Sequence, residues 1–364
     1  MDQTFEIFAS APPGLEPFLL AEVQEAGFGT PVQVPGGVTF QGDWAEVARA
    51  NRALRGAGRV LARFAAFRVM HLAQLDKRAR KLDWAALLRP DVPVRVEVTC
   101  RNSKIYHDRA ARQRVETAIA ETVGAPVLKE ASDEALKIMV RIEDDLAVFS
   151  VDTSGEPLHR RGYKQQVGKA PMRETLASMF LRACGYDGTE TVVDPMCGSG
   201  TFLIEAAEIA AGLAPGRARG FAFDKLALDL PSTALGERRD VAQRFYGSDR
   251  DDGAIRSSVA NAERAGVGDL CSFTRAAVSD LMRPEGPPGL VMVNPPYGAR
   301  IGNRKLLFAL YGSLGAVLKD RFGGWRLGMV TSDGGLAKAT GLALTAGPPV
   351  SFGGLQVKLY QARI

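Results

Sequence analysis

The chain has 364 residues, a length that predicts two or three compact domains. Its 46% hydrophobic and 24% charged residues are typical of a soluble globular protein and exclude a largely disordered chain. The formal net charge is +5, and the positive excess lies mainly in residues 58–170, where Lys and Arg exceed Asp and Glu by 6. Such a region attracts polyanions, although an ordinary basic cytosolic enzyme explains the charge equally well.

The cysteines and histidines do not indicate a metal site. Four cysteines lie far apart without a C-x-x-C pair, and the three histidines form no cluster, so neither a zinc site nor a disulfide framework is expected. The N-terminus lacks the pattern of a signal peptide, and no apolar run approaches the roughly 20 residues that span a bilayer. We therefore expect a cytoplasmic protein that has no membrane segment and requires no metal.

The first 58 residues predict a small ferredoxin-like α+β module. Residues 5–9 alternate as a strand does, and a helical pattern over residues 15–26 ends at Gly27. A second strand is expected at residues 38–40, followed by a helix through residues 44–48.

Residues 59–156 predict a second α+β domain with a basic surface. Residues 94–98 alternate as a half-buried strand, and a helix ending at Gly124 follows. Two further strands, 136–142 and 146–151, flank a turn at residues 143–145. The basic run 77–81 is interpreted as a solvated face, and the polar segment 157–168 as the main linker.

The chain changes character after Pro171. Apolar runs at residues 191–193, 245–247 and 290–293 alternate with helical stretches, which is the pattern of a parallel sheet. Residues 169–364 therefore predict a doubly wound, Rossmann-like α/β domain that ends in an antiparallel strand pair near residues 357–362.

The segment 191–206 is the first candidate site. A short β-branched strand enters a Gly-Ser-Gly turn, and an amphipathic helix begins directly after it. Glycines permit positive φ and close approach of a ligand, and the helix N-terminus offers free N–H groups. Leu203 replaces the third glycine of a dinucleotide fingerprint.

Asp249, at the end of the next strand, is the candidate ligand of ribose hydroxyls. The octad Asp-Pro-Met-Cys-Gly-Ser-Gly-Thr at residues 194–201 is the loop-I motif of class I methyltransferases that act on amino groups.

The tetrad Asn294-Pro295-Pro296-Tyr297 follows an apolar strand and is the second candidate site. The Asn294 side-chain oxygen and the Pro295 carbonyl can each accept one N–H of an exocyclic amine, which would hold its lone pair toward a methyl donor. Tyr297 offers a face on which a planar substrate stacks. The same tetrad suits adenine N6, guanine N2, cytosine N4 and a protein glutamine amide, so it does not choose the acceptor.

Several further segments resemble one family along nearly the whole chain. These are residues 159–164 (HRRGYK), 169–177 (KAPMRETLA) and 221–225 (FAFDK), together with the two candidate sites, while residues 96–114 look like the core of a THUMP domain. The chain resembles bacterial 23S rRNA guanine-N2 methyltransferases in which a THUMP domain precedes a Rossmann-like catalytic domain. The resemblance implies S-adenosylmethionine as the cofactor, RNA as the partner, and an RNA-delivering THUMP region at residues 59–156.

Three departures from the family pattern affect these expectations. Leu226 stands where a tryptophan often follows the FAFDK segment. Ala277 stands where an Asp commonly meets the adenine amino group, with Asp280 three residues later as the alternative. The second methyltransferase domain of some members is not in this sequence.

The sequence thus predicts an RNA (guanine-N2-)-methyltransferase that acts on 23S rRNA, and three alternatives stay open: a tRNA guanine-N2 methyltransferase, a protein-glutamine N5-methyltransferase, and a non-catalytic RNA-binding assembly factor. The expected catalytic residues are Asn294, Pro295, Pro296 and Tyr297. The resemblance implies that Ala170, Pro171 and Met172 lie along the cofactor. The other expected cofactor-binding residues are Asp194, Pro195, Met196, Cys197, Gly198, Ser199, Gly200, Thr201, Asp249 and Asp280. The residues expected to contact RNA, or a neighbouring domain in the case of the linker, are Arg101, Lys104, Arg160, Arg161, Tyr163 and Lys164. Cys197 is expected to pack in the loop and not to act as a nucleophile.

Overall fold

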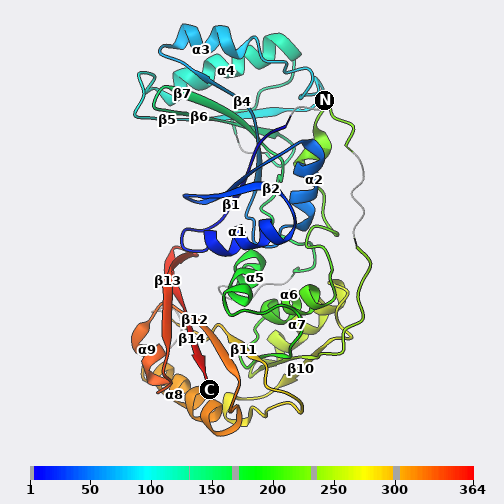
Figure 1. Ribbon diagram of the computed structural model, residues 1–364, viewed down its shortest axis with the longest axis vertical. Coiled ribbons are helices and arrows are strands. Elements are labelled where there is room, and N and C mark those ends of the chain that lie inside the picture. The colour runs from blue at the N-terminus through cyan, green and yellow to red at the C-terminus, as the bar shows by residue number, and fades with distance from the viewer. Residues whose placement is uncertain (1–3, 131, 166–171, 231–235, 298–303) are drawn as a thin grey trace. The chain divides into compact units, whose positions relative to one another are not determined.

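The computed structural model describes residues 4–130, 132–165, 172–230, 236–297 and 304–364 (Figure 1). The chain divides into two compact units, and each is described by itself. The first comprises Met1–Ala11, Leu20–Leu158 and Arg219–Ala234, and the second comprises Pro12–Leu19, His159–Ala218 and Leu235–Ile364.

The first unit is built on a seven-stranded sheet with the order β2-β3-β1-β4-β7-β6-β5. Neighbouring strands are antiparallel except for the parallel pair β5 and β6. Strand β4 pairs with both β1 and β7, so one continuous sheet crosses the predicted boundary at residue 58. The elements are β1 (Phe5–Ser10), α1 (Glu16–Glu25, whose first residues to Leu19 group with the second unit), β2 (Gly29–Val34), β3 (Gly37–Gly42), α2 (Trp44–Ala53), β4 (Val60–Arg68), α3 (Leu72–Ala79), β5 (Val94–Arg101), α4 (Asp108–Val123), β6 (Leu136–Glu143), β7 (Leu146–Asp152) and η1 (Ala222–Lys225).

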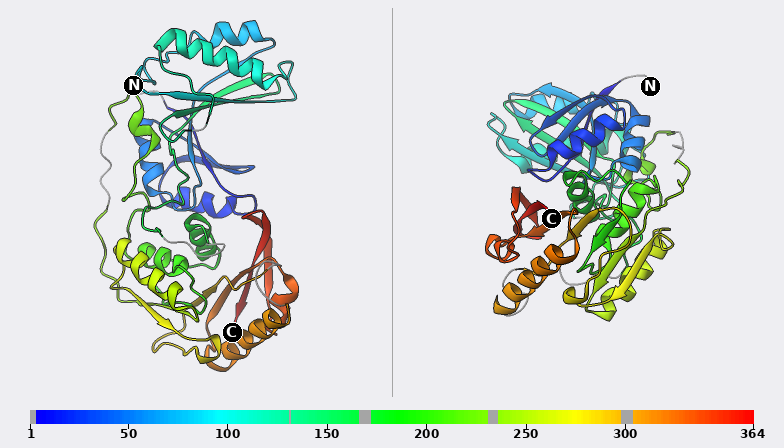
Figure 2. Two further views of the ribbon diagram at one scale, coloured as in Figure 1. Left: turned by 180° about the vertical axis from the view of Figure 1, so that it is seen from behind. Right: turned by 60° about the horizontal axis from the view of Figure 1, so that its bottom comes forward.

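Alternation along the strands explains which face of this sheet is covered. Ile138, Val140 and Ile142 of β6 are buried, whereas Arg141 between them is exposed. Helices α3 and α4 pack together over one face of the β4-β7-β6-β5 part of the sheet (Figures 1 and 2). The turn predicted at residues 143–145 is confirmed: Asp144 and Asp145 have φ of 50° and 63°, which a two-residue hairpin of this twist requires.

The second unit contains a seven-stranded sheet with the order β10-β9-β8-β11-β12-β14-β13. The five strands β10, β9, β8, β11 and β12 are parallel to one another. Strand β14 is antiparallel to both β12 and β13, so the predicted antiparallel strand pair at the end of the chain is confirmed. The elements are α5 (Glu174–Ala183), β8 (Val192–Asp194), α6 (Thr201–Ala210), β9 (Phe245–Asp249), α7 (Asp252–Arg264), β10 (Cys271–Arg275), η2 (Val278–Asp280), β11 (Leu290–Val293), α8 (Arg304–Arg321), β12 (Arg326–Thr331), α9 (Gly334–Ala339), β13 (Thr345–Phe352) and β14 (Leu355–Arg363).

The order of strands in this second sheet reverses between β8 and β11. From β8 the chain builds outward through β9 to β10, and from β11 it builds the other way to β12. Because parallel crossovers are right-handed, α6 and α7 lie on one face of the sheet and α8 lies on the other. Ligands of such sheets bind outside the carboxyl ends of the strands at the point of reversal. The predicted α/β class is confirmed, and this geometry locates the candidate site.

The predicted domain division at residues 58, 156 and 168 remains a prediction. The structure adds that residues 219–234, which lie within the predicted catalytic domain, group with the first unit. There Phe221 stacks on Phe223 with ring centroids 5.0 Å apart, and the Arg219 guanidinium lies 5.1 Å from the Phe221 ring. Among the described residues, no helix combines the length and the apolar character that crossing a membrane requires.

Candidate active site

The loop that follows β8 makes a tight turn into α6. Gly198 and Gly200 have φ of 55° and 81°, a region that side chains rarely adopt. At Gly200 a Cβ would also stand 3.2 Å from atoms of Phe273 and Ser258, whereas at Gly198 it would meet nothing within 4 Å. Gly200 is therefore required for packing beneath the loop, and Gly198 leaves open space beside it.

Helix α7 holds this loop in place through two side chains that the sequence analysis did not identify. The Ser258 hydroxyl donates to the Gly198 carbonyl at 2.8 Å, and the Asn261 side-chain amide donates to the Ser199 carbonyl at 3.1 Å. Both side chains are buried. Their spacing of three residues places them on the same helix face, which is the signal that could have identified them.

Two carboxyl groups lie at the ends of β8 and β9. Asp249 accepts the Gly198 N–H at 3.1 Å and the Asp251 N–H at 2.9 Å, so the ends of these neighbouring strands are directly joined. Asp194 is 2% exposed and accepts the Met196 N–H at 3.1 Å. Burial raises the pKa of Asp194 to about 8, and the nearby Asp249 charge contributes in the same direction. A neutral carboxyl at this position would gain from a cationic ligand, because the ligand would favour its ionised form.

Cys197 packs within the same loop. Its backbone N–H donates to the Ser248 carbonyl, and its Sγ lies 3.8 Å from the Ser258 hydroxyl. Burial holds the pKa of the Cys197 thiol well above its ordinary value. Since the thiolate is the reactive form, this geometry agrees with a packing role and not with a nucleophile.

The tetrad 294–297 begins at the end of β11, directly beside β8. Val291 of β11 pairs in parallel register with Val193 of β8, so the carboxyl ends of these two strands are neighbours at the same edge of the sheet. The Asn294 Oδ1 atom is buried and has no hydrogen-bond partner among the described residues. A buried acceptor without a donor is costly, which marks this atom as the place for an incoming N–H group.

A side chain of helix α8 holds the rest of the tetrad by a hydrogen bond. The Tyr311 hydroxyl of α8 donates to the Pro296 carbonyl at 3.3 Å and contacts the Thr331 hydroxyl at 3.1 Å. Tyr297 is 9% exposed, and burial raises its pKa to about 12, so the phenol is neutral at physiological pH. The structure thus brings together the β8 loop, Asp249 and the tetrad at one edge of the sheet.

Other predicted cofactor residues lie apart or outside the described residues. Ala170 and Pro171 are not among the described residues. Met172 is buried, and its carbonyl accepts the Lys164 ammonium at 2.8 Å. Asp280 is exposed at the end of η2, and its N–H donates to the Ala277 carbonyl at 3.0 Å, so neither residue is singled out as an adenine contact.

The linker residues differ from expectation. Arg161 is 3% exposed and pairs at 3.3 Å with Glu205, which is fully buried. Tyr163 is also 3% exposed, and its carbonyl accepts from Arg264 at 2.7 Å. Buried side chains cannot reach a polyanion, so the predicted RNA contact of Arg161 and Tyr163 is incompatible with their positions in the second unit.

Of the two remaining linker residues, one is largely buried and the other is exposed. Lys164 forms a largely buried ion pair with Glu174 at 3.3 Å, so the carboxylate already compensates the ammonium charge. Arg160, by contrast, is exposed. Of the four linker residues expected to contact RNA, Arg160 is therefore the one whose exposure suits that role.

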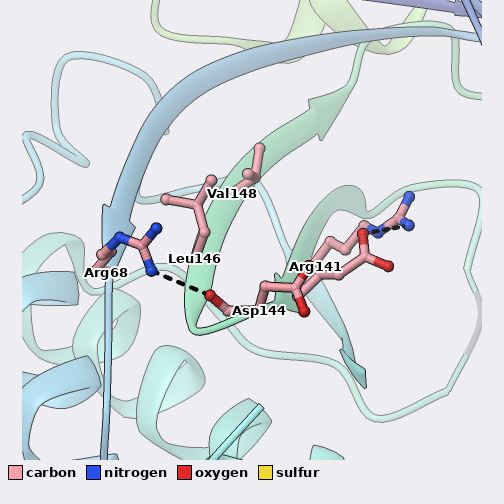
Figure 3. A pocket seen from close by; sticks show the side chains of 6 residues that line it. Arg68, Arg141, Asp144, Leu146 and Val148 are labelled. Carbon is pink, nitrogen blue, oxygen red and sulfur yellow. Dashed lines mark hydrogen bonds and ion pairs between the residues drawn. The ribbon is translucent and has the colours of Figure 1, made fainter. Parts of the chain in front are cut away.

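The other two predicted RNA-binding residues lie together in the first unit. Arg101 and Lys104 are exposed and flank the β6–β7 turn, because the Asp144 N–H donates to the Arg101 carbonyl and the Lys104 N–H donates to Asp145. A hollow of about 250 Å³ lies beside the same turn (Figure 3). Its lining combines cationic, acidic and apolar side chains: Arg68, Arg141, Glu143, Asp144, Leu146 and Val148.

Comparison with known families gives the class of this protein. Residues 161–360 match the model of the RMKL-like methyltransferase domain, which is more than half of the chain. The chain belongs to the RMKL-like methyltransferase family. In addition, residues 6–61 match the RlmL ferredoxin-like domain, which confirms the ferredoxin-like fold at the N-terminus.

Solved structures of similar proteins extend over the whole chain. A protein of Listeria monocytogenes described as a predicted N6-adenine-specific DNA methylase is 29% identical, with a TM-score of 0.83 and coverage of 99% of this chain and 96% of that chain. SMU.472, a methyltransferase solved in complex with SAH, is 26% identical, with a TM-score of 0.84 and coverage of 100% and 99%. TrmN from Thermus thermophilus shares the fold at 23% identity, with a TM-score of 0.76 and coverage of 99% of both chains.

The site of this RMKL-like family member fits S-adenosylmethionine. Gly198 leaves open space at the loop, and Asp194 is a buried carboxyl that a cation would stabilise in its ionised form. No group of three or more His, Cys, Asp or Glu side chains gathers as metal ligands within the described part of the chain.

Proposed function

We propose that this protein is an S-adenosylmethionine-dependent RNA methyltransferase that forms N2-methylguanosine in 23S rRNA. The cofactor is S-adenosylmethionine, because the chain carries a methyltransferase domain and the similar SMU.472 was solved with the demethylated product of that cofactor. The single observation that carries the proposal is the buried, unpaired Asn294 Oδ1 at the end of β11, beside the glycine loop of β8.

The cofactor, when bound, supplies an electrophilic methyl group. The residues proposed to hold it are the loop 194–201, Met172 with its neighbours Ala170 and Pro171, and the carboxylates of Asp249 and Asp280. Asp249 is suited to ribose hydroxyls because it stands at the end of the strand next to β8 and already orders the loop through the Gly198 N–H.

The acceptor amine is proposed to bind at the tetrad. Asn294 Oδ1 and the Pro295 carbonyl each accept one N–H of the amine, which fixes the direction of the nitrogen lone pair toward the β8 loop. Pro296 stiffens the chain between them, and the Tyr311 hydroxyl anchors its carbonyl. Tyr297 stacks on the base. The proton released by the nitrogen passes to solvent, so this step needs no strong base.

RNA as the partner is supported by the surface of the first unit. Tyr106 is 72% exposed, with its ring 4.2 Å from that of His107, and the exposed cations Arg101 and Lys104 precede it. Exposed aromatic rings among cations suit unpaired bases and phosphates. We propose that residues 59–156 act as a THUMP domain and that Arg101, Lys104 and Arg160 contact RNA there and in the linker.

A second acceptor is adenine N6, since the similar Listeria monocytogenes protein is described as a predicted N6-adenine-specific DNA methylase. The tetrad accepts either amine, because both are exocyclic NH₂ groups on planar rings. A tRNA guanine remains the other RNA alternative.

We also propose a cytoplasmic location, which the four unpaired cysteines support.

The test is methylation of RNA extracted from cells that lack this gene, followed by mass spectrometry of the nucleosides. We expect N2-methylguanosine in the 23S fraction, whereas N6-methyladenosine or a tRNA product would support the alternatives. Asn294→Ala should lower kcat at least about 100-fold, because it removes one acceptor from the reacting nitrogen. Asn294→Asp keeps an acceptor oxygen and serves as the matched control. Equal activity of wild type and Asn294→Ala, with cofactor affinity unchanged, would refute the catalytic site.

A further inference from the structure

The N-terminal part of α8 carries an exposed aromatic side chain, Phe308. Phe308 is 38% exposed, and Tyr311, one turn later on the same helix face, is completely buried. Single exposed apolar residues are common on protein surfaces, so the exposure of Phe308 alone does not indicate a function. The position of Phe308 relative to the strand ends does indicate one.

Tyr311 fixes the height of α8 relative to the sheet. Its hydroxyl reaches the carbonyl of Pro296, just beyond β11, and the hydroxyl of Thr331, the last residue of β12. Helix α8 connects the carboxyl end of β11 to the start of β12, so its N-terminal turn lies at the carboxyl edge. Phe308 precedes Tyr311 by three residues, or about 4.5 Å along the axis, and therefore stands above the edge that carries the tetrad.

The surroundings of the Phe308 ring suit a nucleotide. The Arg304 guanidinium lies 5.7 Å from the ring centroid. On the other side the ring approaches the glycine pair after β12, within 3.8 Å of the position that a Cβ at Gly335 would occupy. The ring thus lies beside a glycine that leaves room along its edge and has a cation beside it, a combination that suits a base face and its phosphate.

We propose that Phe308, together with Arg304, stacks the nucleobase that adjoins the target nucleotide in the RNA substrate. This inference rests on the proposed function, because it places the flanking base relative to a target held at Asn294–Tyr297. It also assigns a part in substrate selection to α8, since an RNA whose neighbouring base is stacked elsewhere would lose this contact. Phe308 is a positioning residue in this scheme and touches neither the cofactor nor the reacting nitrogen.

The activity test compares Phe308→Ala, Phe308→Trp and Leu306→Ala on RNA extracted from cells that lack the gene. We expect Phe308→Ala to lower kcat/KM about 5- to 150-fold, the range that loss of one base–aromatic stack produces, with cofactor affinity unchanged. Phe308→Trp should retain wild-type kcat/KM within about 3-fold because indole stacks as well. Leu306, which is 68% exposed on the same turn, is the matched apolar control and should have no effect when shortened.

A binding test that does not depend on turnover uses the added indole of Phe308→Trp. Its fluorescence should be quenched by a single-stranded oligoadenylate, beyond the change seen in the wild type, and Arg304→Ala should weaken this binding. Equal kcat/KM for wild type and Phe308→Ala would overturn this proposal and leave the proposed function intact. A loss with Phe308→Ala that appears on ribosomal particles and not on naked RNA would also overturn it, in favour of a protein partner. If the wild type methylates no RNA, the proposed function fails and this inference falls with it.

Discussion

Ionisation of Asp194 should control the affinity for the cofactor. In the cofactor-free chain this buried carboxyl has a pKa of about 8, so it is mostly neutral at pH 7. S-adenosylmethionine carries a sulfonium and an ammonium group, and either would favour the ionised carboxylate. The ionised fraction is about 1% at pH 6 and about half at pH 8, so the affinity should rise about 50-fold between these values if the ionised form alone binds the cation.

Titration calorimetry at pH 6, 7 and 8, in buffers of different ionisation enthalpy, measures both the affinity and the protons released. We expect the wild type to release nearly one proton per bound cofactor at pH 6. Asp194→Asn is the matched variant, because its side-chain oxygen can still accept the Met196 N–H, and it should bind weakly with no such pH dependence. An affinity of the wild type that stays constant from pH 6 to pH 8, or an equal slope in Asp194→Asn, would refute the reasoning.

The same raised pKa predicts the sign of a stability effect. The unfolded chain ionises Asp194 near its ordinary pKa of 3.8, whereas the folded chain keeps it protonated up to about pH 8. The unfolded state therefore binds fewer protons in this window, and the contribution of Asp194 to the free energy of unfolding falls as pH rises from about 4 to 8. At pH 7 this cost is on the order of 4 kcal/mol. Cofactor-free Asp194→Asn should accordingly show a higher Tm than the wild type at pH 7, with a smaller difference at pH 5.

Three further predictions concern the supports of the site. Lys164→Met leaves the Glu174 charge buried without its partner and should lower the free energy of unfolding by about 3–5 kcal/mol in urea titrations, while the double variant with Glu174→Gln should recover part of the loss. Gly200→Ala should cost about 1–2 kcal/mol at a φ of 81° and weaken cofactor binding in calorimetry, and wild-type affinity in this variant would contradict the geometry of the turn. Asn261→Ala leaves the Ser199 carbonyl without its donor and should cost about 1–3 kcal/mol of stability, measured by thermal unfolding at constant pH.

The sequence predicted the positions of two segments well, because the signals for them are local. The loop 194–201 and the tetrad 294–297 each combine a strand, a turn and the special backbone demands of Gly or Pro within a few residues. Both are found at the strand ends where they were expected. By contrast, β2 was missed because it is an edge strand in which no residue is fully buried, and β10 was missed because exposed polar residues interrupt it.

Contacts between distant residues explain the remaining differences. Ser258 and Asn261 support a loop about 60 residues earlier in the chain, and although their spacing places them on one helix face, nothing near them in the sequence indicates which loop they contact. Arg161 was expected to contact RNA or a neighbouring domain because of its position in the linker, yet Glu205 of α6 compensates its charge in the interior. Pairing partners of this kind depend on the tertiary fold, so local patterns cannot supply them.

The order of the strands also determines in which direction the cofactor must bind along the edge of the sheet. Neighbouring strands are about 4.8 Å apart, so the ends of β8 and β11 are adjacent, whereas the end of β10 lies three strands, or about 14 Å, from the tetrad. The Ala276 N–H donates to the Asp249 carbonyl, which keeps the segment after β10 beside the end of β9. An extended ligand that places its methyl group between β8 and β11 must therefore direct its nucleoside toward Asp249 and the segment 276–280. The reversed orientation would bring the bulky adenine against Asn294, where it would displace the acceptor amine from the buried Oδ1 proposed to receive one of its N–H groups.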